Sequence, residues 1–208
     1  MTGPGRGDLF IVSSPSGGGK TTLIRRLLEN PPGEPLHFSV SHTTRSMRKG
    51  EQEGREYHFV TAEVFQRMVQ RDEFLEHNEV HGHIYGTSCA EVLPHLAAGE
   101  DVVLDIDVQG ARDIRLAYPE AVAIFIVPSS PAELERRLVA RGLDGEESVR
   151  KRLINAAKEV QQAEEFQYVI VNDDLNRATL ELESVVRARR LAPTRQAARL
   201  EHIRKEFH

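Results

Sequence analysis

Short, continuously apolar runs alternate along the chain with longer segments that have helical spacing. The runs cover residues 9–12, 102–104, 123–127 and 168–171. A strand that is buried on both faces of a parallel sheet is typically apolar at every position, as these runs are. The pattern therefore predicts an α/β fold, in which a parallel sheet carries helices on both faces.

Residues from about 37 to 95 depart from this rhythm. They contain short, polar strands with aromatic residues, predicted over 38–40, 57–60 and 74–76. Such strands differ from the apolar core runs and suggest an inserted antiparallel lobe.

A second departure is a highly charged and mostly helical segment later in the chain. Ser130 is a predicted helix cap, with Pro131 at the first helical position and Glu133 completing a capping box. Gly142 would end this helix, and with Gly145 it marks a bend.

We expect these parts to form one domain. Its predicted segments are the core (about 8–36, 96–129 and 157–190), the lobe (about 37–95), the charged helical segment (about 130–156) and a C-terminal helix (about 193–208). The C-terminal stretch is basic and helix-forming after Pro193, and it is interpreted as a solvated surface helix or a contact between copies.

Composition narrows the class of protein. The 208 residues are 39% hydrophobic and 28% charged, as in an ordinary globular protein. A net charge of −5 argues against a general nucleic-acid binder. No apolar run approaches the roughly 20 residues that span a bilayer, and the start of the chain lacks an apolar signal core. Because Cys89 is the one cysteine, no intramolecular disulfide can form, and a cytoplasmic enzyme is expected.

A glycine-rich turn follows the first apolar run and precedes a helix. Residues 14–21 read Ser-Pro-Ser-Gly-Gly-Gly-Lys-Thr, the arrangement of a phosphate-binding loop, with Ser14 where the strict pattern has glycine. Backbone N–H groups of such a loop converge on phosphate oxygens, and the helix N-terminus adds positive potential. Lys20 would reach the β- and γ-phosphates, and the Thr21 hydroxyl can ligate Mg²⁺. The alternative is a glycine-rich turn that binds no ligand.

Two carboxylates end the run at 102–104. Asp105 and Asp107 lie two apart, so on a strand they face the same side. Open α/β sheets bind ligands at this end of their strands. One of the two, Asp105, is expected to hold the Mg²⁺ shell with Thr21. A solvated strand end with two acids is the alternative.

Further motifs decide between the possible nucleotide-binding proteins. They are Ser-His-Thr-Thr-Arg-Ser-Met-Arg-Lys-Gly-Glu at 41–51, Gly-Arg-Glu-Tyr-His-Phe at 54–59, Phe-Leu-Glu at 74–76, Tyr-Gly-Thr-Ser at 85–88, Leu-Asp-Ile-Asp-Val-Gln-Gly at 104–110 and Ile-Val-Asn-Asp-Asp at 170–174. With the phosphate loop, they give a chain that resembles guanylate kinase from about residue 9 to residue 190. The resemblance implies a P-loop core, a GMP-binding lobe and a helical lid.

Two arginines, Arg45 and Arg48, stand three apart and can present rigid donor forks to one phosphate. The resemblance implies that they hold the phosphate of the acceptor GMP with Tyr57 and Tyr85, while Glu51 braces the arginines. A solvated basic loop is the alternative.

Guanine selection is expected at Glu76. A carboxylate accepts hydrogen bonds, and guanine offers its N1–H and N2 amine side by side, whereas adenine offers a bare N1. The resemblance adds Ser41 and Asp107 as further base contacts, and Thr87 stands where the family carries a small hydroxyl, so all three are expected to bind GMP. An exposed strand acid is the alternative for Glu76.

The charged segment carries Arg137 and Arg141, one helical turn apart, followed by Arg152. The resemblance implies that these belong to a lid that delivers arginines to the transferring phosphate, with Arg136 left open as a neighbour. The expected catalytic residues are Lys20, Arg45, Arg137, Arg141 and Arg152. The expected ATP-binding residues are Ser14, Pro15, Ser16, Gly17, Gly18, Gly19, Lys20, Thr21, Thr22 and Asn172, the last beside adenine.

The expected reaction is direct, Mg²⁺-dependent, in-line transfer of the γ-phosphate of ATP to GMP or dGMP, without a covalent enzyme intermediate. The expected partners are these nucleotides, with no nucleic acid or membrane, and a homo-oligomer is left open. Two alternatives remain: a non-catalytic peptide-binding module of similar fold, and a kinase for another monophosphate. A metal site at His77, His81 and His83 is disfavoured, because no Cys or acidic residues complete a zinc shell at those spacings.

Overall fold

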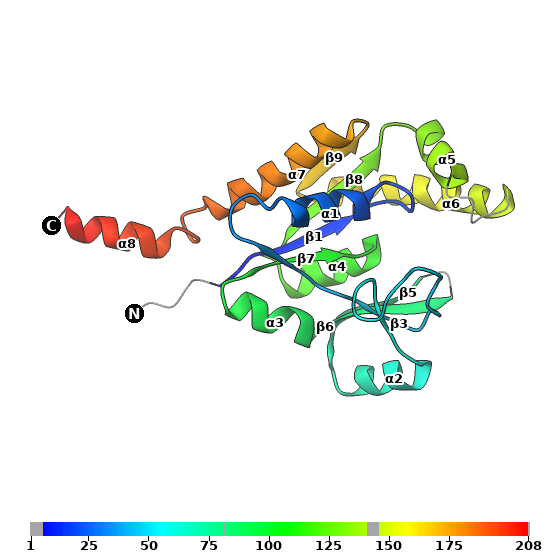
Figure 1. Cartoon of the computed structure of the whole chain (residues 1–208), viewed down its shortest axis with the longest axis horizontal. Helices are drawn as coiled ribbons and strands as arrows, with labels where there is room; N and C mark the ends of the chain where they lie inside the picture. The colour runs from blue at the N-terminus through cyan, green and yellow to red at the C-terminus, as the bar shows by residue number, and fades with distance from the viewer. Residues whose placement is uncertain (1–5, 81, 141–145, 208) are drawn as a thin grey trace.

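A five-stranded sheet forms the centre of the computed structural model, which describes residues 6–80, 82–140 and 146–207 (Figure 1). Its strand order is β2-β7-β1-β8-β9, and every neighbouring pair is parallel. The strands are β1 (Leu9–Ser13), β2 (Leu36–Phe38), β7 (Asp101–Asp105), β8 (Val122–Pro128) and β9 (Tyr168–Asn172). The predicted parallel α/β sheet is therefore confirmed.

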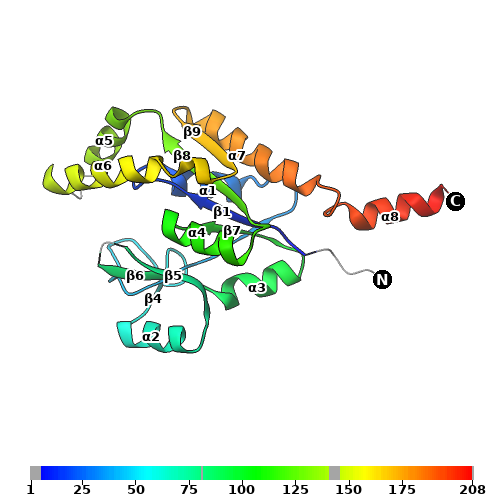
Figure 2. The same cartoon turned by 180° about the vertical axis from the view of Figure 1, so that it is seen from behind.

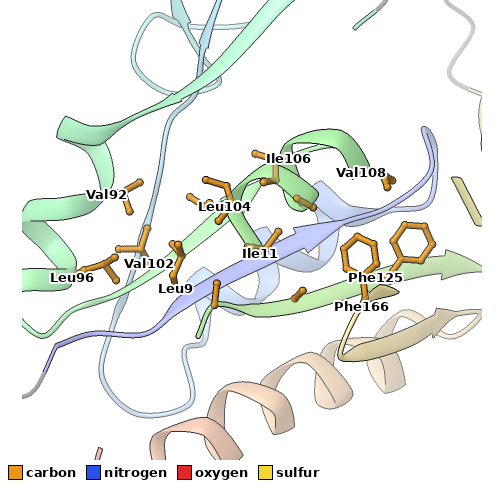
Figure 3. Packing of buried hydrophobic residues seen from close by; sticks show 14 residues of the cluster. Leu9, Ile11, Val92, Leu96, Val102, Leu104, Ile106, Val108, Phe125 and Phe166 are labelled. Carbon is orange, nitrogen blue, oxygen red and sulfur yellow. The ribbon is translucent and has the colours of Figure 1, made fainter. Parts of the chain in front are cut away.

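Helices cover both faces of this sheet, and the pleat of β1 divides its side chains between them. Leu9 and Ile11 pack toward α3 (Cys89–Ala97) and α4 (Val108–Ala117). Figure 2 shows α4 in front of the sheet, and Figure 3 shows the packed side chains in detail. Phe10 and Val12 point the other way, into a cluster with α1 (Lys20–Glu29) and α7 (Leu175–Arg190). Burial on both faces explains why the β1 run is apolar at every position.

The edge strand β9 departs from this rule. Tyr168, Val169 and Val171 are exposed, whereas Ile170 and Asn172 are buried. The prediction that this run is buried on both faces is wrong. The reason is that β9 pairs with β8 alone in this sheet, and α7 covers one of its faces.

The inserted lobe is a second sheet of four strands in the order β4-β3-β6-β5. Its elements are β3 (His42–Thr43), β4 (His58–Phe59), α2 (Ala62–Gln70), β5 (Phe74–Val80) and β6 (His83–Ser88). The β5–β6 and β3–β6 pairs are antiparallel, but β3 and β4 are parallel, so the lobe is a mixed sheet rather than an antiparallel one.

The predicted lobe strand over 38–40 is also wrong. Phe38 ends β2 and pairs with Val103 in the main sheet. Leu36, two residues earlier, is buried against α1 and draws this short segment into the core. The lobe strands begin later, at His42.

Two helices, α5 (Pro131–Ala140) and α6 (Glu146–Val160), form the charged segment, and the short 3-10 helix η1 (Ala163–Glu165) follows. The Ser130 hydroxyl accepts a hydrogen bond from the Glu133 N–H at 3.1 Å, so the predicted cap is present. The reciprocal half of the capping box is wrong, because the Glu133 carboxylate instead accepts from Arg136 and Arg137. Gly142 and Gly145 lie outside the described residues.

The last helix, α8 (Ala197–Glu206), extends away from the sheet (Figures 1 and 2). The chain before it is fixed by Asp101, a buried side chain that binds Arg190 at 2.7 Å and Arg195 at 2.8 Å. Among the described residues, no helix is both long and apolar enough to cross a membrane.

Candidate active site

The loop between β1 and α1 has the backbone of a phosphate cradle. Gly17 and Gly19 adopt φ values of 93° and 97°, which disfavour any residue with a side chain. A Cβ on Gly19 would also lie 2.2 Å from Nδ2 of Asn172. The Ser14 hydroxyl lies 3.1 Å from the carbonyl oxygen of Pro15, so serine is accommodated within the turn.

Lys20 and Thr21 begin α1 and meet the end of β7. Nζ of Lys20 lies 2.7 Å from Oδ1 of Asp105 and donates to the Ile106 carbonyl at 2.6 Å. The Thr21 hydroxyl donates to Oδ2 of Asp105 at 3.2 Å. This places an ammonium, a hydroxyl and a carboxylate side by side where the phosphate loop opens.

The donor set at this point suits Mg²⁺. The ion prefers oxygen ligands and takes one or two from protein, with water and substrate phosphates completing its shell. The Thr21 hydroxyl and the Asp105 carboxylate are such ligands and are within hydrogen-bond distance of each other. Across the described residues, no group of three or more His, Cys, Asp or Glu side chains could hold a metal by itself.

In the lobe, Arg45 is fixed by Glu51. Two parallel hydrogen bonds join the guanidinium to the carboxylate at 2.8 and 3.0 Å, and Arg45 is 8% exposed. The centre of the Tyr57 ring lies 5.3 Å from the guanidinium carbon of Arg45. The centres of the Tyr57 and Tyr85 rings are 5.6 Å apart. The hydrogen bond from Arg45 lowers the pKa of Glu51, which keeps this pair charged. Arg48 contributes its backbone N–H to Glu51 at 2.7 Å.

Glu76 is a buried carboxylate, 8% exposed, that comes from β5. Its Oε1 accepts from the Thr87 backbone N–H at 3.1 Å and from the Thr87 hydroxyl at 2.7 Å. A Cβ on Gly110 would lie 2.8 Å from Oε2, so glycine allows α4 to approach this carboxylate. Burial, which favours the neutral acid, raises the pKa of Glu76 to about 7, while the Thr87 hydrogen bonds oppose the shift.

The arginines of α5 and α6 contact the phosphate loop. Arg137 donates to the carbonyls of Gly18 and Asn172 at 3.2 and 2.7 Å, and Arg152 donates to the Ser16 hydroxyl at 2.6 Å. The side chain of Arg136 is 70% exposed and binds Glu133. Arg141 lies outside the described residues.

A cavity of about 280 Å³ joins the phosphate loop to the lobe. The predicted site residues that line it are Ser14, Pro15, Ser16, Gly17, Gly19, Lys20, Thr21, Ser41, Tyr57, Glu76, Tyr85, Asp105 and Asp107. The remaining predicted residues that the structure describes are not part of this lining: Gly18, Thr22, Arg45, Arg48, Glu51, Thr87, Arg137, Arg152 and Asn172. Asp107 also caps α4, accepting from the Gly110 N–H at 2.9 Å.

The motifs did not identify Glu159, a half-buried carboxylate on α6 that lines the same cavity. Burial raises the pKa of Glu159, and the hydrogen bond from the Ser16 N–H opposes that rise. Glu159 follows Arg152 by seven residues, so both lie on one face of the helix and both reach Ser16. This seven-residue spacing from Arg152 was the feature of the sequence that could have identified Glu159.

Known proteins resemble this chain in both sequence and structure. A family model described as Guanylate kinase matches residues 6–189. A guanylate kinase of Vibrio vulnificus (strain YJ016) is 49% identical over 195 residues, covering 94% of each chain. One from Escherichia coli (strain K12) is 49% identical over 194 residues, covering 93% of this chain and 94% of the other. The crystal structure of guanylate kinase from Anaplasma phagocytophilum superposes with a TM-score of 0.79 at 34% identity, covering 97% of this chain and 96% of that one.

Proposed function

The chain belongs to the guanylate kinase family and phosphorylates GMP, and we propose that it does so by direct in-line transfer of the γ-phosphate of ATP. The observation that carries the mechanism is one cavity lined at one end by the phosphate loop with Lys20 and at the other by Glu76. A triphosphate in the loop and a guanine at the carboxylate would bring donor and acceptor phosphates together between them.

On the donor side, Lys20 neutralises charge on the β- and γ-phosphates, and the loop N–H groups orient them. Thr21 and Asp105 would hold Mg²⁺, which supplies further positive charge to the phosphate oxygens when bound. In this proposal Asn172, whose side chain lies beside Gly19, is next to the adenine ring of bound ATP.

On the acceptor side, Arg45, Arg48, Tyr57 and Tyr85 bind the GMP phosphate. The ion pair of Arg45 with Glu51 supports this role, because it holds the guanidinium in one orientation before substrate binds. The phosphate oxygen of GMP is already anionic, so the attack needs no strong general base. Positioning and positive charge then account for the chemistry.

At the base end, the ionised Glu76 accepts from N1–H and the N2 amine of guanine, with Ser41, Thr87 and Asp107 as neighbours. Adenine cannot supply these donors, so a buried carboxylate would lose both of the hydrogen bonds that guanine offers it. Deoxy-GMP offers the same base edge and phosphate, so we include it as an acceptor.

We further propose that the lobe (about 37–95) and the lid (about 130–156) close over the two substrates to exclude water. Arg137, Arg141 and Arg152 would then meet the transferring phosphate, and the contacts of Arg137 and Arg152 with the loop support their nearness to it. A cytoplasmic location fits the lone cysteine, and α8 remains a solvated helix or a contact between copies.

The test is ADP release from Mg²⁺–ATP with GMP, dGMP, AMP, UMP or CMP as acceptor. We expect turnover with GMP and dGMP and at most a few per cent of it with the others. Equal turnover with AMP would overturn the role of Glu76. Binding of GMP without any ADP release would favour a non-catalytic module.

A further inference from the structure

One polar side chain beside Glu76 has no part in the mechanism described above. Asn78 lies two residues further along β5, on the same face of the strand. Its Nδ2 donates to Oε2 of Glu76 at 3.4 Å and to Oδ2 of Asp113 at 2.9 Å. An amide nitrogen carries two hydrogens, so Asn78 serves both carboxylates at once.

The two partners come from different parts of the fold. Glu76 belongs to the lobe, whereas Asp113 lies on α4, a helix of the core that packs against β5 (Figure 2). Asn78 therefore connects the guanine-reading carboxylate to a rigid element of the core. Thr87 holds Oε1 of Glu76, and Asn78 contacts the other oxygen.

We propose that Asn78 is a positioning residue for guanine selection, which holds the Glu76 carboxylate, together with Thr87, in the plane that meets the guanine edge. Both oxygens must point at adjacent donors for a bidentate pair to form, and a carboxylate held at one oxygen can still rotate. This inference rests on the proposed role of Glu76 and adds the residue that orients it.

The same contact acts on the charge of Glu76. An N–H donor favours the ionised form of a carboxylate, and ionised Glu76 is the form that accepts from guanine. Two acids are near this carboxylate: Asp107, whose negative charge disfavours ionisation, and Asp113, which Asn78 separates from it. Lys20, Asp105 and Glu159 line the same cavity. Asn78 thus donates hydrogen bonds to both Glu76 and Asp113, two carboxylates whose negative charges would otherwise repel each other.

The experiment compares the parent chain with Asn78→Ala, Asn78→Asp and a control, Glu79→Ala. Glu79 is the exposed neighbour on the opposite face of β5, so its replacement perturbs the strand but not the carboxylate. Initial rates are measured against GMP at saturating Mg²⁺–ATP, and against ATP at saturating GMP, from pH 6 to pH 9.

For Asn78→Ala we expect the KM for GMP to rise about tenfold. The kcat and the KM for ATP should stay within about twofold of the parent, since those steps do not use this contact. The rise of kcat/KM for GMP with pH should move to higher pH, because the ionised carboxylate has lost a donor.

Asn78→Asp is the deciding variant, because aspartate has the shape of asparagine but offers no N–H and adds a negative charge. The proposal expects a larger KM for GMP than in Asn78→Ala, and a further shift of the pH profile. If Asn78→Asp matches the parent, shape alone matters and the proposal is overturned. The same holds if Asn78→Ala behaves like Glu79→Ala while the parent phosphorylates GMP. A parent chain without GMP turnover would instead overturn the proposed function.

Discussion

Lys20 and Asp105 form an ion pair at 2.7 Å that joins the first turn of α1 to the end of β7. The same carboxylate accepts from the Thr21 hydroxyl, so one acid both orients the lysine and lies where we propose that Mg²⁺ binds. Parallel strands β1 and β7 are neighbours in the sheet, which is why residues far apart in sequence meet here. The ends of these strands form the edge at which open α/β sheets bind ligands.

Asp105→Asn tests this double role. The variant keeps the shape of the side chain but loses its charge, so Lys20 is held less firmly and Mg²⁺ loses an anionic ligand. We expect kcat to fall about 10- to 100-fold and the Mg²⁺ concentration for half-maximal rate to rise, with GMP binding unchanged. Steady-state rates over a Mg²⁺ titration measure both effects.

Asp72→Asn is the matched control for that substitution. Asp72 follows α2, is exposed and has a φ of 52°, a conformation that asparagine also accepts. It should behave as the parent. An Asp105→Asn enzyme with an unchanged Mg²⁺ dependence would contradict the assignment of this carboxylate to the metal.

Glu76→Gln should weaken GMP binding about 100-fold and leave ATP binding within about twofold. Glutamine presents an amide donor toward guanine N1–H or N2, so one of the two contacts becomes a donor–donor clash. Calorimetric titration of each nucleotide gives the two affinities separately. An equal loss for ATP and GMP would show that the change had damaged the whole cavity instead of its base end.

The pH dependence of GMP binding follows from the pKa of about 7 at Glu76. This pKa is raised above the ordinary value of a carboxyl group, so the acid is protonated below pH 7, and a protonated oxygen cannot accept from guanine. GMP affinity should therefore be high above pH 7 and fall by up to about tenfold per pH unit well below it.

The phosphate of GMP also titrates, with a pKa of about 6 for a phosphate monoester, so a control is needed. Glu76→Gln supplies it, because its affinity for GMP can vary with pH through the phosphate but not through position 76. The prediction concerns the difference between the two profiles. Parallel profiles from pH 5.5 to pH 8.5 would contradict the raised pKa.

Much of the sheet was predictable because its central strands are apolar at every position, and burial on both faces imposes that pattern. The strand β2 was not, because it is three residues long and includes His37, and its place depends on pairing with β7. The predicted capping box also failed at Glu133, because its carboxylate binds Arg136 and Arg137 instead of the backbone N–H at the start of the helix.

In the site, too, some residues could be predicted from the sequence and others could not. Consecutive residues fix the phosphate loop, so a linear motif reveals it. Glu159 and Asn78 escaped because their partners, Ser16 and Asp113, come from distant elements. Helical or strand periodicity predicts which side chains share a face. It does not predict which residues that face contacts, because these depend on how α6 packs on the phosphate loop and how β5 packs on α4.

Gly19→Ala should lower ATP affinity more than about tenfold and destabilise the fold by about 1–3 kcal/mol. The residue combines a φ of 97° with a close approach to the Asn172 amide, so a methyl group meets strain and a neighbour together. Gly82→Ala separates these causes, because Gly82 has a φ of 79° and a methyl group added there would meet no atom of the described residues within 4 Å. The control should lose some stability and retain ATP binding, as measured by calorimetry and thermal unfolding.

Asp101→Ala should reduce stability without reducing the activity of the folded enzyme. Asp101 is 2% exposed, binds Arg190 and Arg195, and accepts from the Asp8 N–H at 2.8 Å. Removing it takes the carboxylate from the partly buried Arg190 and one of two carboxylates from Arg195, whose Nε still lies 3.3 Å from Asp8. This loss should lower the free energy of unfolding by about 3 kcal/mol. Urea unfolding measures this loss. The control is Glu147→Ala, which removes an exposed ion pair with Lys151 and should leave the midpoint of urea unfolding nearly unchanged. If Asp101→Ala unfolds at the parental midpoint but loses GMP turnover, this cluster serves the active site rather than the attachment of the C-terminal segment.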